Sequence, residues 1–117
     1  MNALSEKSLK FAVRIFKLAK HLDSKKEFII SNQILRSGTS IGANISEALY
    51  AESKLDYIHK YSIAQKECSE TLYWLMILNE TKILSTEEFT SIHEDCVELM
   101  KLLVKTLKTL KSKKNNT

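Results

Sequence analysis

Basic side chains recur near the start of the chain at a spacing that would place them along one edge of a helix. Alternating steps of three and four residues separate Lys7, Lys10, Arg14, Lys17 and His21. Residues three and four apart lie on the same side of an α-helix. A row of cationic groups attracts nucleic-acid phosphates by releasing their counterions. The spacing therefore predicts contact with the backbone of RNA or DNA.

A second basic series near the end of the chain has the same property. It consists of Lys101, Lys105, Lys108 and Lys111. An ordinary solvated surface accounts for both series equally well, since lysines near a helix C-terminus complement the helix dipole and their stems cover apolar surface. No aromatic interleaving supports base stacking, so any nucleic-acid contact would be mostly to the backbone. Both interpretations stay open.

The charges are segregated along the sequence. Residues 1–26 carry seven Lys/Arg and two acids, residues 27–98 carry five and twelve, and residues 99–117 carry six lysines and no acid. The two ends are basic and the middle is acidic. In an antiparallel bundle the ends would be neighbours, so we expect their charges to merge into one positive region.

The stretch from Gln33 to Ala48 is unusual because it lies where a helix is expected yet is rich in Ser, Thr and Gly. Gly costs about 1 kcal/mol relative to Ala inside a helix, so small side chains must offer a compensating close approach or polar network. At 100° per residue, five polar positions fall within about 80° of one another. They are Gln33, Arg36, Ser40, Asn44 and Glu47.

Two interpretations of this polar stripe remain open. The first is a hydrogen-bonded network that fixes the register of the helix. The second is a subunit contact in which Arg36 and Glu47 pair across an interface with an acid such as Glu70, while Gly38 and Gly42 let another helix approach closely. We favour a structural or assembly role over a ligand site.

Enzymatic chemistry finds little support in the residue pattern. Carboxylate-bridged metal sites in helix bundles need two Glu-x-x-His motifs, and only Asp56 with His59 approaches one. We therefore expect no metal and no other cofactor. Cys68 and Cys96 lack a convincing histidine base, so we interpret them as small buried hydrophobes, not as a nucleophile or redox pair.

The composition indicates one soluble domain over residues 1–117. Hydrophobic residues make up 44% and charged residues 27%, with two glycines and no proline. No apolar run is long enough to span a bilayer and no signal peptide is apparent, so we expect a cytoplasmic protein without membrane contact. The tail at about 111–117 is expected to fray.

Helix punctuation predicts four helices, at about 5–22, 25–52, 54–81 and 86–110. Capping-box patterns mark two starts, Ser24 with Glu27 and Ser85 with Glu88, and Ser53 with Asp56 is a weaker signal. In the first helix Leu9, Ala12, Phe16 and Ala19 are expected to widen the buried stripe. The last helix is apolar over so much of its circumference that a partner outside the bundle is expected too. Short connections predict an all-α, antiparallel up-down-up-down four-helix bundle.

The segment QILRSGTSIGANISEA (Gln33–Ala48) resembles the signature of the four helix bundle protein family, the intervening-sequence proteins of 23S ribosomal RNA. The resemblance continues through Tyr57–Ile58, Ile63–Ala64 and Glu67–Leu75 and covers most of the chain. Ala48 stands where the family usually has Gly, and Gly42 where Pro is common.

The resemblance implies a bacterial cytoplasmic protein that forms a homopentameric ring. It also implies kinship with the accessory variability protein of diversity-generating retroelements, a basic pentameric barrel that binds nucleic acid and a reverse transcriptase. Our leading hypothesis is a non-enzymatic pentamer that binds RNA or DNA. The rival is an oligomeric adaptor that recruits a polymerase or another enzyme without touching nucleic acid.

Overall fold

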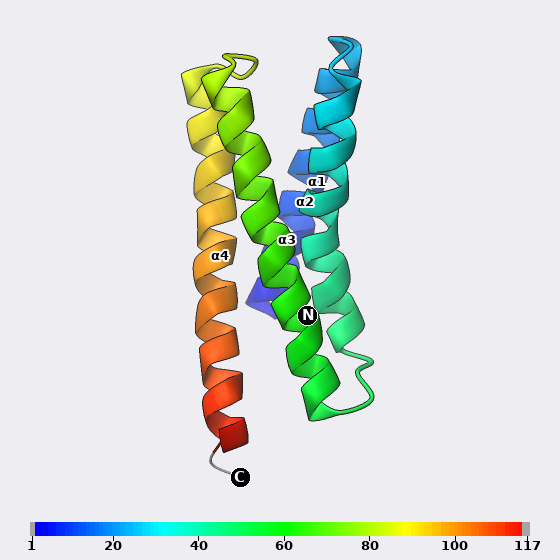
Figure 1. Ribbon diagram of the computed structural model, residues 1–117, viewed down its shortest axis with the longest axis vertical. Helices are drawn as coiled ribbons and strands as arrows, with labels where there is room; N and C mark the ends of the chain where they lie inside the picture. The colour runs from blue at the N-terminus through cyan, green and yellow to red at the C-terminus, as the bar shows by residue number, and fades with distance from the viewer. Residues whose placement is uncertain (1, 116–117) are drawn as a thin grey trace.

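The computed structural model describes residues 2–115 as an antiparallel bundle of four α-helices (Figure 1). Their bounds are α1 Ala3–Ser24, α2 Phe28–Ala48, α3 Lys54–Glu80 and α4 Thr86–Asn115. Each helix packs against the next in the chain, α1 and α4 close the bundle, and the described helices make no diagonal contact. The predicted all-α four-helix bundle is confirmed.

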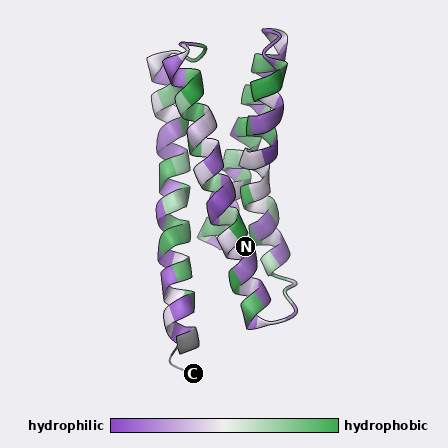
Figure 2. Ribbon diagram, in the orientation of Figure 1, coloured by the Kyte–Doolittle hydropathy of each residue, from purple (hydrophilic) through white to green (hydrophobic). Residues whose placement is uncertain are grey.

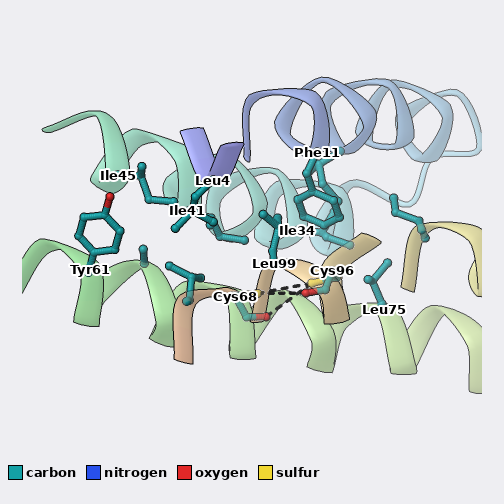
Figure 3. Packing of buried hydrophobic residues seen from close by; sticks show 14 of the residues in the cluster. Leu4, Phe11, Ile34, Ile41, Ile45, Tyr61, Cys68, Leu75, Cys96 and Leu99 are labelled. Carbon is teal, nitrogen blue, oxygen red and sulfur yellow. Dashed lines mark hydrogen bonds between the residues drawn. The ribbon is translucent and has the colours of Figure 1, made fainter. Parts of the chain in front are cut away.

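One apolar core runs the length of the bundle, and all four helices contribute to it (Figure 3). The largest side chains at its centre are at most 2% exposed; they include Phe11, Ile15, Ile34, Ile41, Tyr61, Leu75 and Leu99. Cys68 and Cys96 meet in this core with their sulfur atoms 3.8 Å apart. Their contact sets the register of α3 against α4.

The small residues of α2 bring α1 unusually close. A Cβ atom on Gly38 would stand 2.7 Å from Cγ2 of Ile15, and one on Gly42 would stand 3.2 Å from Oγ of Ser8. Ser31 lies on the same side and donates its hydroxyl to the carbonyl of Ala19 at 3.0 Å. The close approach expected at the two glycines is therefore made by the first helix of the same chain.

The junction of α2 and α3 is also built on small polar residues. The hydroxyl of Thr71 donates to Ser37 Oγ at 2.9 Å, and the two side chains are fully buried. A buried hydroxyl without a partner would cost about 1–3 kcal/mol, so the pairing lets serine and threonine occupy core positions. The Ser, Thr and Gly residues that lower the helix propensity of α2 therefore make these close contacts possible.

Two of the predicted helix starts are confirmed. Ser85 and Glu88 form the reciprocal capping box, with Glu88 N donating to Ser85 Oγ at 3.1 Å and Ser85 N to Glu88 Oε1 at 2.9 Å. These bonds hold the pKa of Glu88 below its ordinary value. Ser53 caps α3 by accepting from Asp56 N at 3.0 Å.

The predicted capping box of Ser24 and Glu27 is wrong. α1 runs through Ser24, whose hydroxyl donates to the carbonyl of His21, and Glu27 makes no side-chain cap for α2. The physical reason is the way α1 ends. Glu27 N donates to the carbonyl of Leu22 and Lys26 N to that of Asp23, which is the Schellman pattern.

At the opposite end, α4 continues to Asn115, through most of the tail that was expected to fray. Residues 116–117 of that tail lie outside the described residues.

We expect Gly38→Ala to destabilise the fold by about 1–2 kcal/mol, because overpacking against Ile15 outweighs the gain of about 1 kcal/mol in helix propensity. Gly42→Ala is the matched control, since its contact at 3.2 Å is to a serine hydroxyl, and we expect it to be neutral or stabilising. Urea denaturation measures both changes. Equal stabilities for the two variants would contradict the packing argument.

Lys26 occupies the left-handed position of the Schellman turn, with φ 64°. Because a side chain there costs about 1 kcal/mol that glycine avoids, Lys26→Gly should raise the free energy of unfolding by about that amount. Lys25 has φ −94°, so Lys25→Gly should lower stability instead. Thermal melts of the two variants, which lose the same charge, separate backbone strain from electrostatics.

Candidate nucleic-acid and subunit interfaces

The basic edge of α1 faces a row of acids on α4. Lys7 Nζ lies 2.5 Å from Glu98 Oε1, and the pKa of Lys7 is raised by that hydrogen bond. Arg14 Nη1 donates to Asp95 Oδ2 at 2.6 Å and Nη2 to Ser91 Oγ at 3.1 Å. Both basic groups are thus engaged within the chain, where they join α1 to α4.

The two remaining lysines of this edge are exposed. Lys10 borders a hollow between α1 and α4 that Asp95 and Glu98 also line, and Lys17 lies on the outer side of α1. The acids of α4 therefore offset much of the charge of the α1 edge. The α1 edge therefore does not merge with the end of α4 into one positive region as expected, and the end of α4 is positive by itself.

The second basic series is fully outward. Lys101, Lys105, Lys108 and Lys111 are all exposed. α4 continues past the N-terminal end of α1 (Figure 1). Because Lys7 pairs with Glu98, α1 has only about 6 Å of helix left beyond this level, whereas α4 has about 25 Å. We call exposed Lys105, Lys108 and Lys111, which lie beyond the end of α1, the α4 lysine end.

The polar stripe of α2 is used inside one chain. Arg36 reaches α3, where it bonds to Glu67 Oε2 at 3.3 Å and to Glu70. Glu70 also accepts from Trp74 Nε1 at 3.0 Å. Glu47 lies 3.5 Å from Lys60 Nζ. Arg36 and Glu70 pair within one chain, whereas the expectation placed this pair across a subunit interface.

The other members of the stripe stay on α2 itself. Ser40 Oγ donates to the carbonyl of Arg36 at 2.6 Å, Asn44 Nδ2 donates to that of Ser40 at 2.8 Å, and Gln33 is exposed. Trp74, on α3, joins this network through Glu70 and is absent from the residues that the sequence pattern singled out. Its spacing of four residues from Glu70 was the available signal.

Two apolar side chains of α1 are misassigned by the sequence pattern. Leu9 is 54% and Phe16 50% exposed, so they do not widen the buried stripe as predicted. Leu9 borders a groove of about 490 Å³ between the outer sides of α1 and α2. Ala12, Thr39, Gly42, Ala43 and Leu49 are among the other residues that line it. We call it the α1–α2 groove.

The described residues offer few groups for catalysis. The hydrogen bond with Cys68, together with burial, raises the pKa of the Cys96 thiol, and both cysteines are inaccessible. Over the described part of the chain, no three His, Cys, Asp or Glu side chains gather as metal ligands would. No helix among these residues has the length and apolarity to cross a membrane.

Comparison with known proteins identifies a family and includes a close structural relative. The family model of the 23S rRNA-intervening sequence protein matches residues 2–105. A crystal structure of a protein of unknown function from the S23 ribosomal protein family of Bacteroides thetaiotaomicron is 51% identical, with a TM-score of 0.88. It covers 91% of this chain, and the match spans 99% of the relative. No curated protein matches.

We expect neither cysteine to react with a thiol-specific disulfide reagent in the folded protein, because both sulfur atoms are buried away from the reagent. Both should react when the protein is unfolded in guanidinium. Thr90→Cys, at an exposed position of α4, provides a rapidly reacting control. Fast labelling of Cys68 or Cys96 without denaturant would show that the pair is accessible and chemically active.

Proposed function

The chain belongs to the 23S rRNA-intervening sequence protein family, and from that premise we propose that it is a cytoplasmic, non-enzymatic homopentamer that binds the backbone of RNA or DNA. The observation that carries the proposal is the α4 lysine end. It presents exposed positive charge at one end of the bundle, past the last acid of α4, Glu98.

Charge balance favours this surface over the α1 edge. Lys7 and Arg14 already have carboxylate partners, so a phosphate would have to displace an existing ion pair. The acids of α4 end at Glu98, so no acid of this helix lies between the residues of the α4 lysine end or beyond them. Such a surface releases counterions from a phosphate backbone without discriminating among bases.

Repetition supplies what one lysine cluster lacks. A few exposed lysines bind phosphate weakly, but several copies held in one assembly raise avidity without any new contact. The pentamer rests on the resemblance to ring-forming relatives.

A second candidate function is an oligomeric adaptor that recruits a reverse transcriptase or another enzyme. The α1–α2 groove and the exposed Leu9 and Phe16 favour it, because apolar patches of this kind mark protein contacts. Salt separates the two functions. A nucleic-acid complex weakens steeply as salt is added, and a packed protein interface does so much less.

We expect Lys105→Glu combined with Lys108→Glu to lower affinity for a mixed short RNA by about tenfold or more in low salt, and to make the salt dependence shallower. The matched control is Lys25→Glu with Lys26→Glu, which makes the same charge change at the opposite end of the bundle. Fluorescence anisotropy across a salt series measures both. Equal losses would indicate a response to net charge only, and unchanged binding by the first variant would remove the α4 lysine end from the proposal.

A further inference from the structure

The outward side of α2 carries almost no charge. Between Phe28 and Ala48 the charged residues are Arg36 and Glu47 alone, and both form ion pairs with α3 of the same chain. α4 contrasts with this, because charged residues recur along it from Glu87 to Lys113, and Figure 2 shows hydrophilic segments along its coloured length. Loss of charge is the compositional signature of an interface core, whereas a solvated helix keeps its charges.

The α1–α2 groove has the shape to receive large side chains. Its floor is made of small residues, including Ala12, Gly42 and Ala43. Three exposed apolar side chains stand beside it on α1, at the helical spacing of Leu9, Val13 and Phe16. Protruding apolar side chains of a partner would fit against the small residues of the groove and contact the apolar side chains beside it.

Such a row lies on the opposite side of the same molecule. Because each helix contacts only its neighbours around the bundle, the α3–α4 pair faces away from the α1–α2 pair. Tyr73 at 60% and Met76 at 53% are exposed one turn apart on α3, whereas Val104, 44% exposed on α4, lies about 20 Å from Tyr73 along the bundle because Cys68 and Cys96 are level. We call this side of the bundle the α3–α4 face.

The two surfaces occur at the same height along the bundle. Arg14 bonds to Ser91 and Asp95, so Val13 lies level with that turn of α4. Tyr73 follows Cys68 by five residues and Ser91 precedes Cys96 by five, so the Cys68–Cys96 contact places Tyr73 at this level too. Two copies side by side in the same orientation would bring these apolar residues together.

The exposed charges agree with that orientation. Lys17 and Lys20 flank the outer side of α1 near its end, and exposed Glu87 and Glu94 lie at similar levels on α4. Toward the other end the signs reverse. Glu6 lies on α1 directly before Lys7. Lys101 lies on α4 one turn from Glu98, which is the partner of Lys7. Side-by-side parallel copies would therefore set opposite charges together at both ends.

We propose that the α1–α2 groove of one copy receives the α3–α4 face of the next, with the helices of the two copies running parallel. The contact is heterologous, so a pair of copies keeps one free face on the first and one free groove on the second, and repetition of the contact closes a ring where its rotation divides a full turn. This inference rests on the homo-oligomer of the proposed function and assigns its two faces. It also places every α4 lysine end on one rim of the ring.

The test uses one variant for each face. Leu9→Glu places a charge on the α1–α2 groove, and Tyr73→Glu places one on the α3–α4 face. We expect each variant to be monomeric by light scattering. Mixed one to one, they should form a heterodimer of twice the monomer mass, because the intact face of one fits the intact groove of the other and no further copy can add. Ile29→Glu, at a position 84% exposed on the α2 side toward Arg36, is the control and should keep the wild-type mass.

Circular dichroism of each variant checks that the bundle is folded. If Tyr73→Glu keeps the wild-type mass while Leu9→Glu does not, the groove pairs with something other than the α3–α4 face and the inference is overturned, although the homo-oligomer stands. Two monomeric variants that do not combine would overturn it as well. A monomeric wild-type protein would remove the homo-oligomer itself, and RNA binding by that monomer would still test the α4 lysine end separately.

Discussion

The close contact between α1 and α2 is the constraint on which the rest of this bundle depends. Gly38 admits Ile15 to a distance that no side chain at that position would allow, and Gly42 lets Ser8 approach closely as well, although less tightly. The two glycines lower the helix propensity of α2, and the close packing that they allow compensates for the stability lost in this way. Because α1 then lies deep against α2, both helices keep an outer strip of small and apolar residues, from which the α1–α2 groove is made.

Polar contacts between neighbouring helices complete the arrangement and decide which charges remain free. Lys7 and Arg14 are satisfied by α4, while Arg36 and Glu47 are satisfied by α3. These pairs are partly exposed, and each contributes little more than a fraction of a kcal/mol to stability. Their larger effect is on the surface, because they neutralise the sides of the bundle and leave the excess positive charge on the α4 lysine end.

The sequence predicts those features of the fold that depend on one helix at a time. The capping box of Ser85 and Glu88 and the cap that Ser53 makes for α3 follow from local spacing. Features that depend on a neighbouring helix do not. The basic row of α1 looks unpaired in the sequence, but acids of α4 lie opposite it. Leu9 and Phe16 have the spacing of core residues, but they lie on the exposed side of α1. The Schellman turn at Lys26 escaped notice because glycine, its usual signal, is absent.

A bundle of this size has little surface to spare, and the division of its charges assigns different tasks to different parts. Apolar, charge-poor sides suit contacts with protein, whereas an isolated cationic end suits contacts with phosphate. The two tasks support each other only if assembly leaves the α4 ends accessible and on the same side. A contact that used one face twice, about an axis perpendicular to the helices, would point the lysine ends in opposite directions. A contact that joins two different faces of parallel copies gathers them, and thereby converts a weak patch on each chain into one multivalent surface.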